Sequence, residues 1–167
     1  DALGIEAEFT RLHLPETLPG RGAEPLDPAR LPALHITVDD LRLGSAALGS
    51  ARIETAPLAD GLRVEVLETR TDALTVRGTG EWRLTPAGER SAFDVTFDAD
   101  SLGRMLDALG YAGIIDGGEC EVRLNGSWGG SPGQFALARV TGTLSAEVGP
   151  GRILVINPGA ARMHGLV

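Results

Sequence analysis

The side chains that could carry out chemistry are few and widely spaced in this chain of 167 residues. His13, His35 and His164 are far apart, and none has the spacing to another histidine or to a carboxylate that a metal site requires. Such isolated histidines are typical of structural or exposed positions. The sequence therefore predicts no metal site.

Two pairs of aspartates, Asp39 with Asp40 and Asp98 with Asp100, could supply a general acid and a general base. Both pairs stand at predicted turns or at a predicted helix start, where aspartate is favoured because its carboxylate accepts hydrogen bonds from free backbone N–H groups. Capping is therefore the stronger interpretation. The single cysteine, Cys120, lies on the apolar side of a predicted strand, which favours a small buried residue over a reactive thiol.

The glycine-rich segment 126–133 lacks the lysine and the strand-to-helix context of a phosphate-binding loop, so it predicts a connection between strands. No serine stands in the surroundings of a nucleophile elbow. Because no residues are left to carry a reaction, we expect a protein that is not an enzyme and that uses no cofactor.

Charge and composition narrow the possible partners. The formal net charge is -8 and the isoelectric point is near 4.8, which argues against nucleic acid and against an anionic membrane surface, because both need clustered cations. A hydrophobic share of 43% is enough to bury a core, so one domain or a piece of a larger one is expected. The longest aliphatic run, 153–156, is far shorter than a membrane span. Since the chain begins at Asp1, we expect a fragment of a much larger protein, with room for a targeting or membrane segment upstream.

One predicted helix between two strands organises the chain. The flanking strands alternate apolar with polar residues, and their apolar positions are Phe93, Val95, Phe97, Cys120, Val122, Leu124 and Trp128. Apolar residues recur at helical spacing over 101–109, at Leu102, Met105, Leu106 and Leu109. Asp100 or Ser101 suits the N-cap, and Gly110 suits the C-terminal cap. We expect the apolar stripe of this helix to be buried against the sheet.

Short strands separated by glycine and proline turns make up the rest of the chain. A strand is predicted over 5–14, and the prolines of 15–32 predict a loop, which is the best candidate hinge. The strand that starts at Leu34 changes phase at Asp39 and Asp40, where we expect a bulge or a corner. In the strand over 74–84, Gly78 and Gly80 leave room for a close approach to its apolar face. A long strand over 135–148, a strand at 153–156 and a short helix over 160–167 follow.

These patterns predict a mainly β fold. The strands follow one another at about ten-residue spacing, which is typical of a curved antiparallel sheet built as a meander. One face of the sheet is apolar, one amphipathic helix lies on it, and a short C-terminal helix ends the chain. Alternating strands of this kind fit an open groove and a closed sandwich equally well.

Three runs of the sequence together resemble the C-terminal part of the YhdP branch of the AsmA-like proteins: DDLRLGSAALGSARIETAPLADGLRVEVLETRTDALTVRGTGEW, DSLGRMLDALGYAGIIDGGECEVRLNGSW and FALARVTGTLSAEVGPGRILVINPGAARMHGLV. The resemblance covers about Leu34 to Val167, with the helix, loops and terminal segment in the same order. It does not extend to residues 1–33, an N-terminal strand and Pro-rich loop without an assigned role. His164 stands where an aliphatic residue is expected before the final Gly-Leu.

Members of this family are large envelope proteins of Gram-negative bacteria with an N-terminal inner-membrane helix. The function ascribed to their long periplasmic β-groove is to conduct phospholipid toward the outer membrane. The resemblance implies that residues 34–167 are one segment of such an open apolar groove, β-taco-like in form. It also implies that the segment binds phospholipid or another acyl-chain lipid on the periplasmic side of the envelope. The inner-membrane anchor would belong to an absent N-terminal part of the parent protein.

The expected lining of this groove is a set of apolar strand residues: Leu62, Val64, Val66, Leu74, Val76, Trp82, Phe93, Val95, Phe97, Val122 and Leu124. Their common phase is the reason for the assignment, because a slip by one residue would turn a whole strand's apolar set to the polar side. The face carries few large aromatics and several glycines, so it packs poorly on itself and leaves space for acyl chains.

Two other functions stay open. A β-sandwich adhesion or carbohydrate-binding module would need exposed aromatic platforms, yet Trp82 and Trp128 fall on apolar faces and only Tyr111 is left. A purely structural envelope segment, which spaces other parts and carries nothing, fits the same pattern. Detection of bound lipid by mass spectrometry would separate this spacer from a lipid-transport segment.

Overall fold

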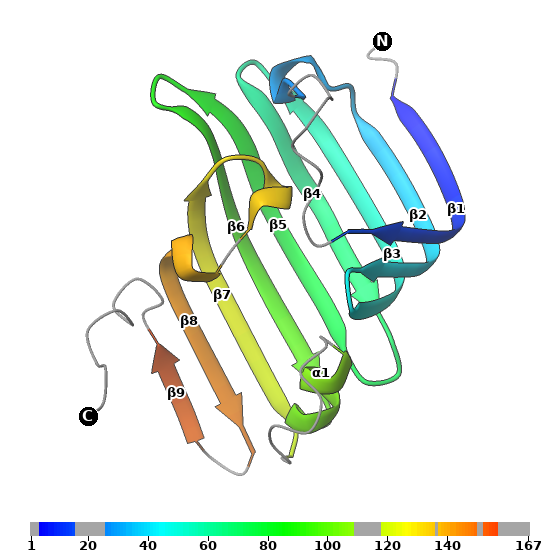
Figure 1. Ribbon diagram of the computed structural model, residues 1–167, viewed down its shortest axis with the longest axis vertical. Helices are drawn as coiled ribbons and strands as arrows, with labels where there is room; N and C mark the ends of the chain where they lie inside the picture. The colour runs from blue at the N-terminus through cyan, green and yellow to red at the C-terminus, as the bar shows by residue number, and fades with distance from the viewer. Residues whose placement is uncertain (1–3, 16–25, 109–117, 136, 150–151, 157–167) are drawn as a thin grey trace.

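The computed structural model describes residues 4–15, 26–108, 118–135, 137–149 and 152–156. These residues form one open sheet of nine strands, whose order in space follows their order in the chain (Figure 1). The strands are β1 (Ile5–Leu14), β2 (Leu34–Leu43), β3 (Ala46–Leu58), β4 (Gly61–Arg70), β5 (Thr75–Thr85), β6 (Gly88–Ala99), β7 (Cys120–Gly129), β8 (Thr141–Val148) and β9 (Arg152–Ile156). The prediction of a mainly β fold is confirmed. In the described part of the chain the strands form one sheet rather than two packed sheets.

One pair of strands departs from the predicted antiparallel order. β1 and β2 are parallel, with Ile5 opposite Leu34 and Leu14 opposite Leu43, whereas every later pair is antiparallel. Parallel neighbours require a crossover connection that returns to the starting end of the first strand. The described part of the Pro-rich segment, which precedes β2, contains a short 3-10 helix, η1 (Pro28–Arg30), in which Pro28 is fully buried. The predicted hinge segment therefore packs at this point.

The phase change predicted at Asp39 and Asp40 is confirmed. Val38 lies opposite Ala51 and Leu41 lies opposite Gly49, so β2 carries one residue more than β3 over this stretch. Because β1 pairs Phe9 with Val38 and Leu12 with Leu41, it changes phase at the same level. Such a bulge bends a strand and strengthens its twist, and both strands turn there (Figure 1).

A second bulge makes one residue assignment wrong. In β4, Val64 lies opposite Gly80 and Leu67 lies opposite Gly78, so β4 has one extra residue between these pairs. Val66 is consequently paired with Glu54, while Leu67 is paired with Ile53. Since side chains of directly opposed residues point to the same face, Leu67 takes the place predicted for Val66.

Three segments lie on one face of the sheet, which we call the covered face. They are η1, the helix α1 (Leu102–Ala108), and a strap that contains two 3-10 helices, η2 (Pro132–Gln134) and η3 (Leu137–Arg139) (Figure 1). The strap replaces the first half of the strand predicted over 135–148, and β8 begins only at Thr141. The reason is local: Val140 turns inward onto Leu124 and Trp128, and its side chain is 1% exposed.

The predicted helix is confirmed, but a different residue anchors it. Met105 is 5% exposed and packs with Leu74, Val76 and Cys120, whereas Leu106 is half-exposed and lies outside this cluster. The Ser101 hydroxyl accepts a hydrogen bond from the Arg104 N–H, as its predicted capping role requires. Leu109, Gly110 and the helix predicted over 160–167 lie outside the described residues.

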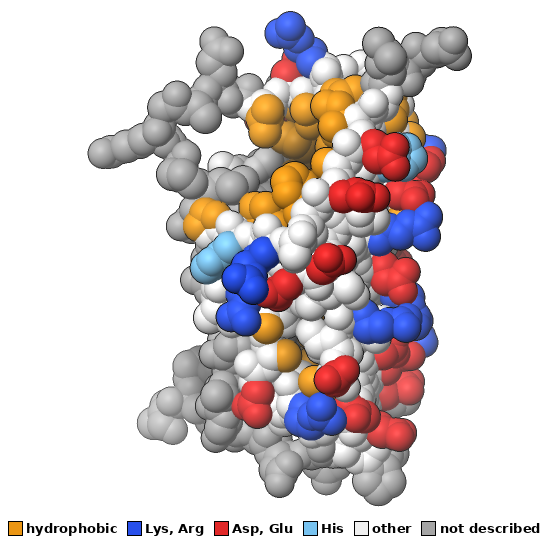
Figure 2. All heavy atoms as spheres, turned by 90° about the vertical axis from the view of Figure 1, so that its right-hand side faces the viewer, with side chains coloured by type: hydrophobic (Ala, Val, Ile, Leu, Met, Phe, Trp, Pro, Cys, Tyr) orange, Lys and Arg blue, Asp and Glu red, His pale blue; other side chains and the backbone are white. Residues whose placement is uncertain are grey.

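The opposite face of the sheet, here called the outer face, is polar. Seen from the β1 edge, charged side chains gather along one side of the sheet and apolar side chains lie beside them (Figure 2). Ion pairs between neighbouring strands include Arg63 with Glu81, at 3.0 Å, and Arg77 with Asp98, at 3.5 Å. The two faces therefore differ as the strand alternation predicts.

We expect Met105→Ala to lower the free energy of unfolding by about 2–5 kcal/mol, because the change leaves a cavity under α1. Leu106→Ala is the matched control on the same helix, and it should cost less than half as much because Leu106 is half-exposed. Urea unfolding followed by circular dichroism measures both. A larger loss for Leu106→Ala would contradict this assignment of the helix anchor.

Candidate functional site

One row of residues runs across the covered face from strand to strand. Each member lies directly opposite the next, one from each of β1 to β8: Ala7, Ile36, Ile53, Leu67, Gly78, Val95, Leu124 and Leu144. We call this set the middle row. It contains no charged or polar side chain. All its members are half-buried except Leu124, which is 7% exposed.

The middle row is bordered on one side by η1 and the strap. η1 packs on β3, β4 and β5, and the strap places Val140 against Gly126, where an added Cβ would lie 2.4 Å from Val140 Cγ1. Trp128 stacks on Phe93 with ring centroids 5.6 Å apart, and its indole N–H donates to the Ser131 carbonyl. These contacts hold the strap against β6 and β7.

The other border is made by α1 and the strand ends beneath it. Met105 and Cys120 are in contact there, with the Cys120 thiol 3.8 Å from Met105 Sδ. Val76 and Leu74 complete the buried cluster. The middle row therefore lies between two covered zones and is itself the less buried strip of this face.

Two polar side chains on the covered face are satisfied within the protein. The Thr55 hydroxyl accepts a hydrogen bond from the Leu34 N–H at 3.0 Å, and the Ser91 hydroxyl donates to the Gly130 carbonyl at 2.8 Å. Thr69 is 3% exposed, and its hydroxyl has no hydrogen-bond partner among the described residues. All three lie outside the middle row, so that row offers a ligand contact with apolar groups alone.

The outer face offers charges that already have partners. Arg83 bonds Glu81 at 2.7 Å and Asp60 at 3.0 Å. Hydrogen bonds from Arg83 and Arg63 hold the pKa of Glu81 below its usual value, and the bonds to Glu81 and Asp60 raise the pKa of Arg83. This network is consistent with a solvated structural face rather than with a site.

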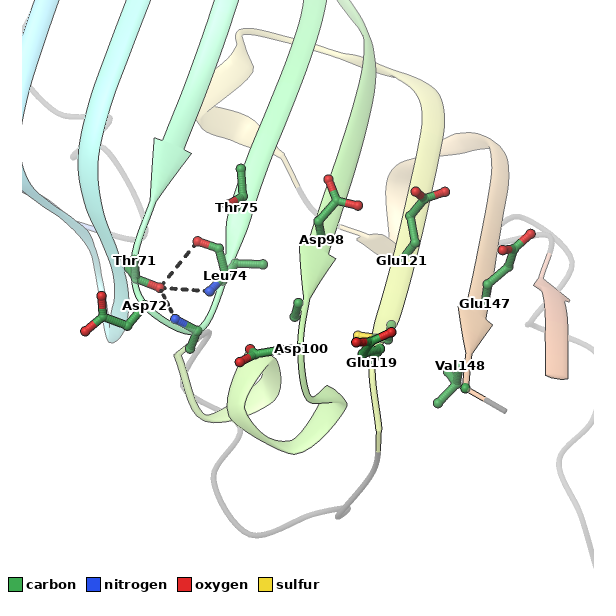
Figure 3. A pocket seen from close by; sticks show the side chains of 14 residues that line it. Thr71, Asp72, Leu74, Thr75, Asp98, Asp100, Glu119, Glu121, Glu147 and Val148 are labelled. Carbon is green, nitrogen blue, oxygen red and sulfur yellow. Dashed lines mark hydrogen bonds between the residues drawn. The ribbon is translucent and has the colours of Figure 1, made fainter. Parts of the chain in front are cut away.

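A hollow of about 720 Å³ lies where β5, β6, β7 and β8 end near α1. Carboxylates stand around it, among them Asp72, Asp98, Glu119 and Glu147, and they come from separate strand ends (Figure 3). Among the described residues, no group of three or more His, Cys, Asp or Glu side chains is arranged to hold a metal ion.

Three of the four aspartates considered as general acids or bases form ion pairs with arginines. Asp98 pairs with Arg77, and Asp100 pairs with Arg104 at 3.1 Å. Asp40 pairs with Arg11 and with Arg42 at the bulge. The side chains of His13 and His35 are exposed, and His164 lies outside the described residues. These contacts leave the aspartate pairs without a shared site.

The structure brings the predicted lining together on the covered face, with Val66 as the exception already described. Six of these lining residues are each at most 9% exposed, so they are not available to a ligand: Leu62, Val64, Leu74, Val76, Trp82 and Leu124. Sequence reasoning missed Ile36, Ile53, Leu67 and Leu144. Only the register between strands identifies these residues as one row, and the alternation within a single strand does not reveal that register.

The room expected at Gly80 is occupied by the protein itself. A Cβ added there would lie 2.4 Å from Phe93 Cδ1, so the phenyl ring of the neighbouring strand covers this glycine. At Gly78 an added Cβ would lie 3.1 Å from Val95 Cγ2. The glycines therefore serve the packing between β5 and β6.

The family model described as YhdP protein matches residues 1–167, so the match includes residues 1–33 as well. No curated protein and no solved structure matches the chain. Within the described residues, no helix has the length and apolar character that crossing a membrane requires.

Burial raises the pKa of the Cys120 thiol, and the nearby carboxylate of Asp98 adds to the rise. The unfolded thiol titrates near pH ~8.5. Above that pH the unfolded chain releases a proton that the folded chain keeps, so the free energy of unfolding should fall as pH rises toward the folded pKa. Urea unfolding between about pH 8 and pH 10 measures this slope. Cys120→Ala should flatten it, and an unchanged slope would exclude the thiol as its source.

Proposed function

The chain belongs to the YhdP family, and from that membership we propose that it is one segment of a lipid-transport path in the bacterial envelope. The segment binds the acyl chains of phospholipid or of another acyl-chain lipid along the covered face. Its role is to hold and pass on the lipid rather than to change it chemically. It stands on the periplasmic side, with the inner-membrane anchor supplied by another part of the parent protein.

The observation that carries this proposal is the middle row. Hydrocarbon chains need continuous apolar contact and offer no hydrogen-bond partner, so a single charge in their path would be costly. The middle row supplies such contact from β1 to β6 and again on β8 with no polar member, while its β7 member, Leu124, lies under Val140 of the strap. Because it runs from strand to strand, the path crosses the sheet rather than following one strand.

The partial exposure of the row supports a ligand rather than a closed core. A fully buried residue already contacts its neighbours on all sides, whereas Ile53, Leu67 and Val95 each keep exposed surface. Contiguous exposed apolar surface of this kind marks an interaction site in soluble proteins. An acyl chain along the row would remove that surface from water.

The ends of the row also support a continuous path. At the β1 edge, Ile5 is 52% exposed and Phe9 is 41% exposed, and both lie on the same face as Ala7. At the other end the register continues from Leu144 to Ile156 in β9.

The rival functions have less support. Trp82 and Trp128 are each 7% exposed, so neither offers a platform for a sugar ring. A spacer with no ligand accounts for the sheet but gives no reason for the half-exposed row. The following experiment therefore has to distinguish a spacer from a lipid-transport segment.

We expect Val95→Asp to prevent lipid loading, because a carboxylate in the middle row stays hydrated or protonates at a cost of several kcal/mol. The matched control is Thr96→Asp, the next residue along β6, which the register places on the outer face between Arg77 and Arg123. Photo-crosslinking of a diazirine-bearing phospholipid to the protein should fall by at least about tenfold in the first variant only.

Circular dichroism must show that both variants are folded. If folded Val95→Asp loads lipid as well as Thr96→Asp does, the row is not the path and the spacer takes its place.

A further inference from the structure

The arginines of this chain divide into two groups, and the division points to the lipid headgroup. The sequence has arginine but no lysine. Most described arginines form ion pairs with carboxylates, among them Arg11, Arg42, Arg52, Arg63, Arg70, Arg77, Arg83, Arg104 and Arg123. Three arginines with described side chains, Arg30, Arg90 and Arg139, have no carboxylate of another described residue within 4.0 Å.

Two of these three arginines are on the segments that border the middle row. Arg30 ends η1, which packs on β3, β4 and β5. Arg139 ends η3 in the strap, directly before Val140, which packs on β7. Both side chains are exposed. The same border of the row therefore carries one arginine over the first half of the sheet and one over the second half.

The carboxylates of this border are already occupied. Asp27, at the start of η1, accepts a hydrogen bond from the Ala29 N–H at 2.9 Å. Glu89, at the same end of the sheet, accepts one from the Trp82 indole N–H at 3.0 Å. These bonds link the two carboxylates to the protein, whereas Arg30 and Arg139 have no such bond to a carboxylate of a described residue.

The end of the sheet beside α1 has the reverse charge. Asp72, Asp100 and Glu119 are exposed around the hollow there (Figure 3). The hollow opens toward the outer face, because its lining residues Asp98 and Glu121 lie directly opposite each other on that face. An anionic group would be repelled from this end of the sheet and attracted to the other end.

We propose that Arg30 and Arg139 bind the phosphodiester of lipids whose acyl chains lie on the middle row. This inference rests on the proposed lipid path. It adds a contact to the lipid headgroup, by which the protein would distinguish phospholipids from other acyl-chain ligands. Guanidinium groups suit this role because their N–H donors match phosphate oxygens two at a time. In a protein of net charge -8, such local cations favour the approach of the phosphodiester.

Two probes with the same diazirine-bearing acyl chains test the proposal: phosphatidylethanolamine, which has the phosphodiester, and diacylglycerol, which lacks it. Each is crosslinked to the full chain and quantified by mass spectrometry. Arg30→Gln combined with Arg139→Gln should reduce phosphatidylethanolamine crosslinking about tenfold and leave diacylglycerol crosslinking unchanged. Arg90→Gln is the matched control, because Arg90 is exposed and bonds the Ser127 hydroxyl of the outer face, at 2.8 Å.

A lysine version of the double variant keeps both charges and should retain phosphatidylethanolamine crosslinking within about threefold of the original chain. It also provides a folded reference if the glutamine version is unstable in circular dichroism. Phosphorus NMR of inorganic phosphate alone forms a third arm. We expect no arginine-dependent broadening of its line, because the acyl chains supply most of the affinity.

The outcomes separate the two proposals. An equal loss for both probes, no loss for either, or an equal loss in Arg90→Gln overturns the headgroup site while the lipid path stands. Arginine-dependent binding of inorganic phosphate alone would assign the site to a free anion instead of a lipid. Failure of diacylglycerol to crosslink to the original chain overturns the lipid path, and the headgroup site with it.

Discussion

The register between strands is the constraint on which the rest of this structure depends. Side chains alternate between the two faces of a strand, so a slip of one residue would turn apolar residues outward and charged residues inward. Eight strands keep the middle row in line only because the bulges in β2 and β4 each reset the phase. Without the bulge in β4, Leu67 would lie opposite a polar residue of β3 instead of Ile53. The continuity of the apolar row is thus a property of the whole sheet.

The covering segments depend on the same register. Val140 reaches the sheet because Gly126 has no side chain at that position, and Met105 meets Cys120 because β7 begins under α1. Each segment closes one part of the covered face and leaves the middle row less buried. The ion pairs of the outer face contribute little to stability individually, since their side chains are exposed. They keep that face hydrated. Among the arginines with described side chains, they leave Arg30 and Arg139 on the covering segments without an ion pair to a described residue.

The sequence was sufficient to predict the single-strand features. Alternation located the strands around Trp82 and Phe93, helical spacing located α1, and the two aspartates located the bulge in β2. The sequence was insufficient to predict features that depend on the pairing between strands. Val66 continues the alternation of Leu62 and Val64, so nothing local indicates the bulge beside it. The strap was predicted as a strand because Phe135 and Val140 are apolar, yet they pack on Trp128 from above the sheet. The parallel pairing of β1 follows from the crossover, which has no alternation of its own.

The central claim is that the middle row is the path of the acyl chains, and a photo-crosslinking scan across the strands tests it most directly. A photoreactive amino acid is placed in turn at Ile36, Ile53, Leu67 and Leu144 of the folded protein, and each variant is irradiated in the presence of phospholipid vesicles. The account predicts lipid adducts at all four positions and none at the outward-facing neighbours His35, Glu54, Glu68 and Thr143. Adducts at the outward positions as often as at the inward ones, or no adducts at any position, would contradict it.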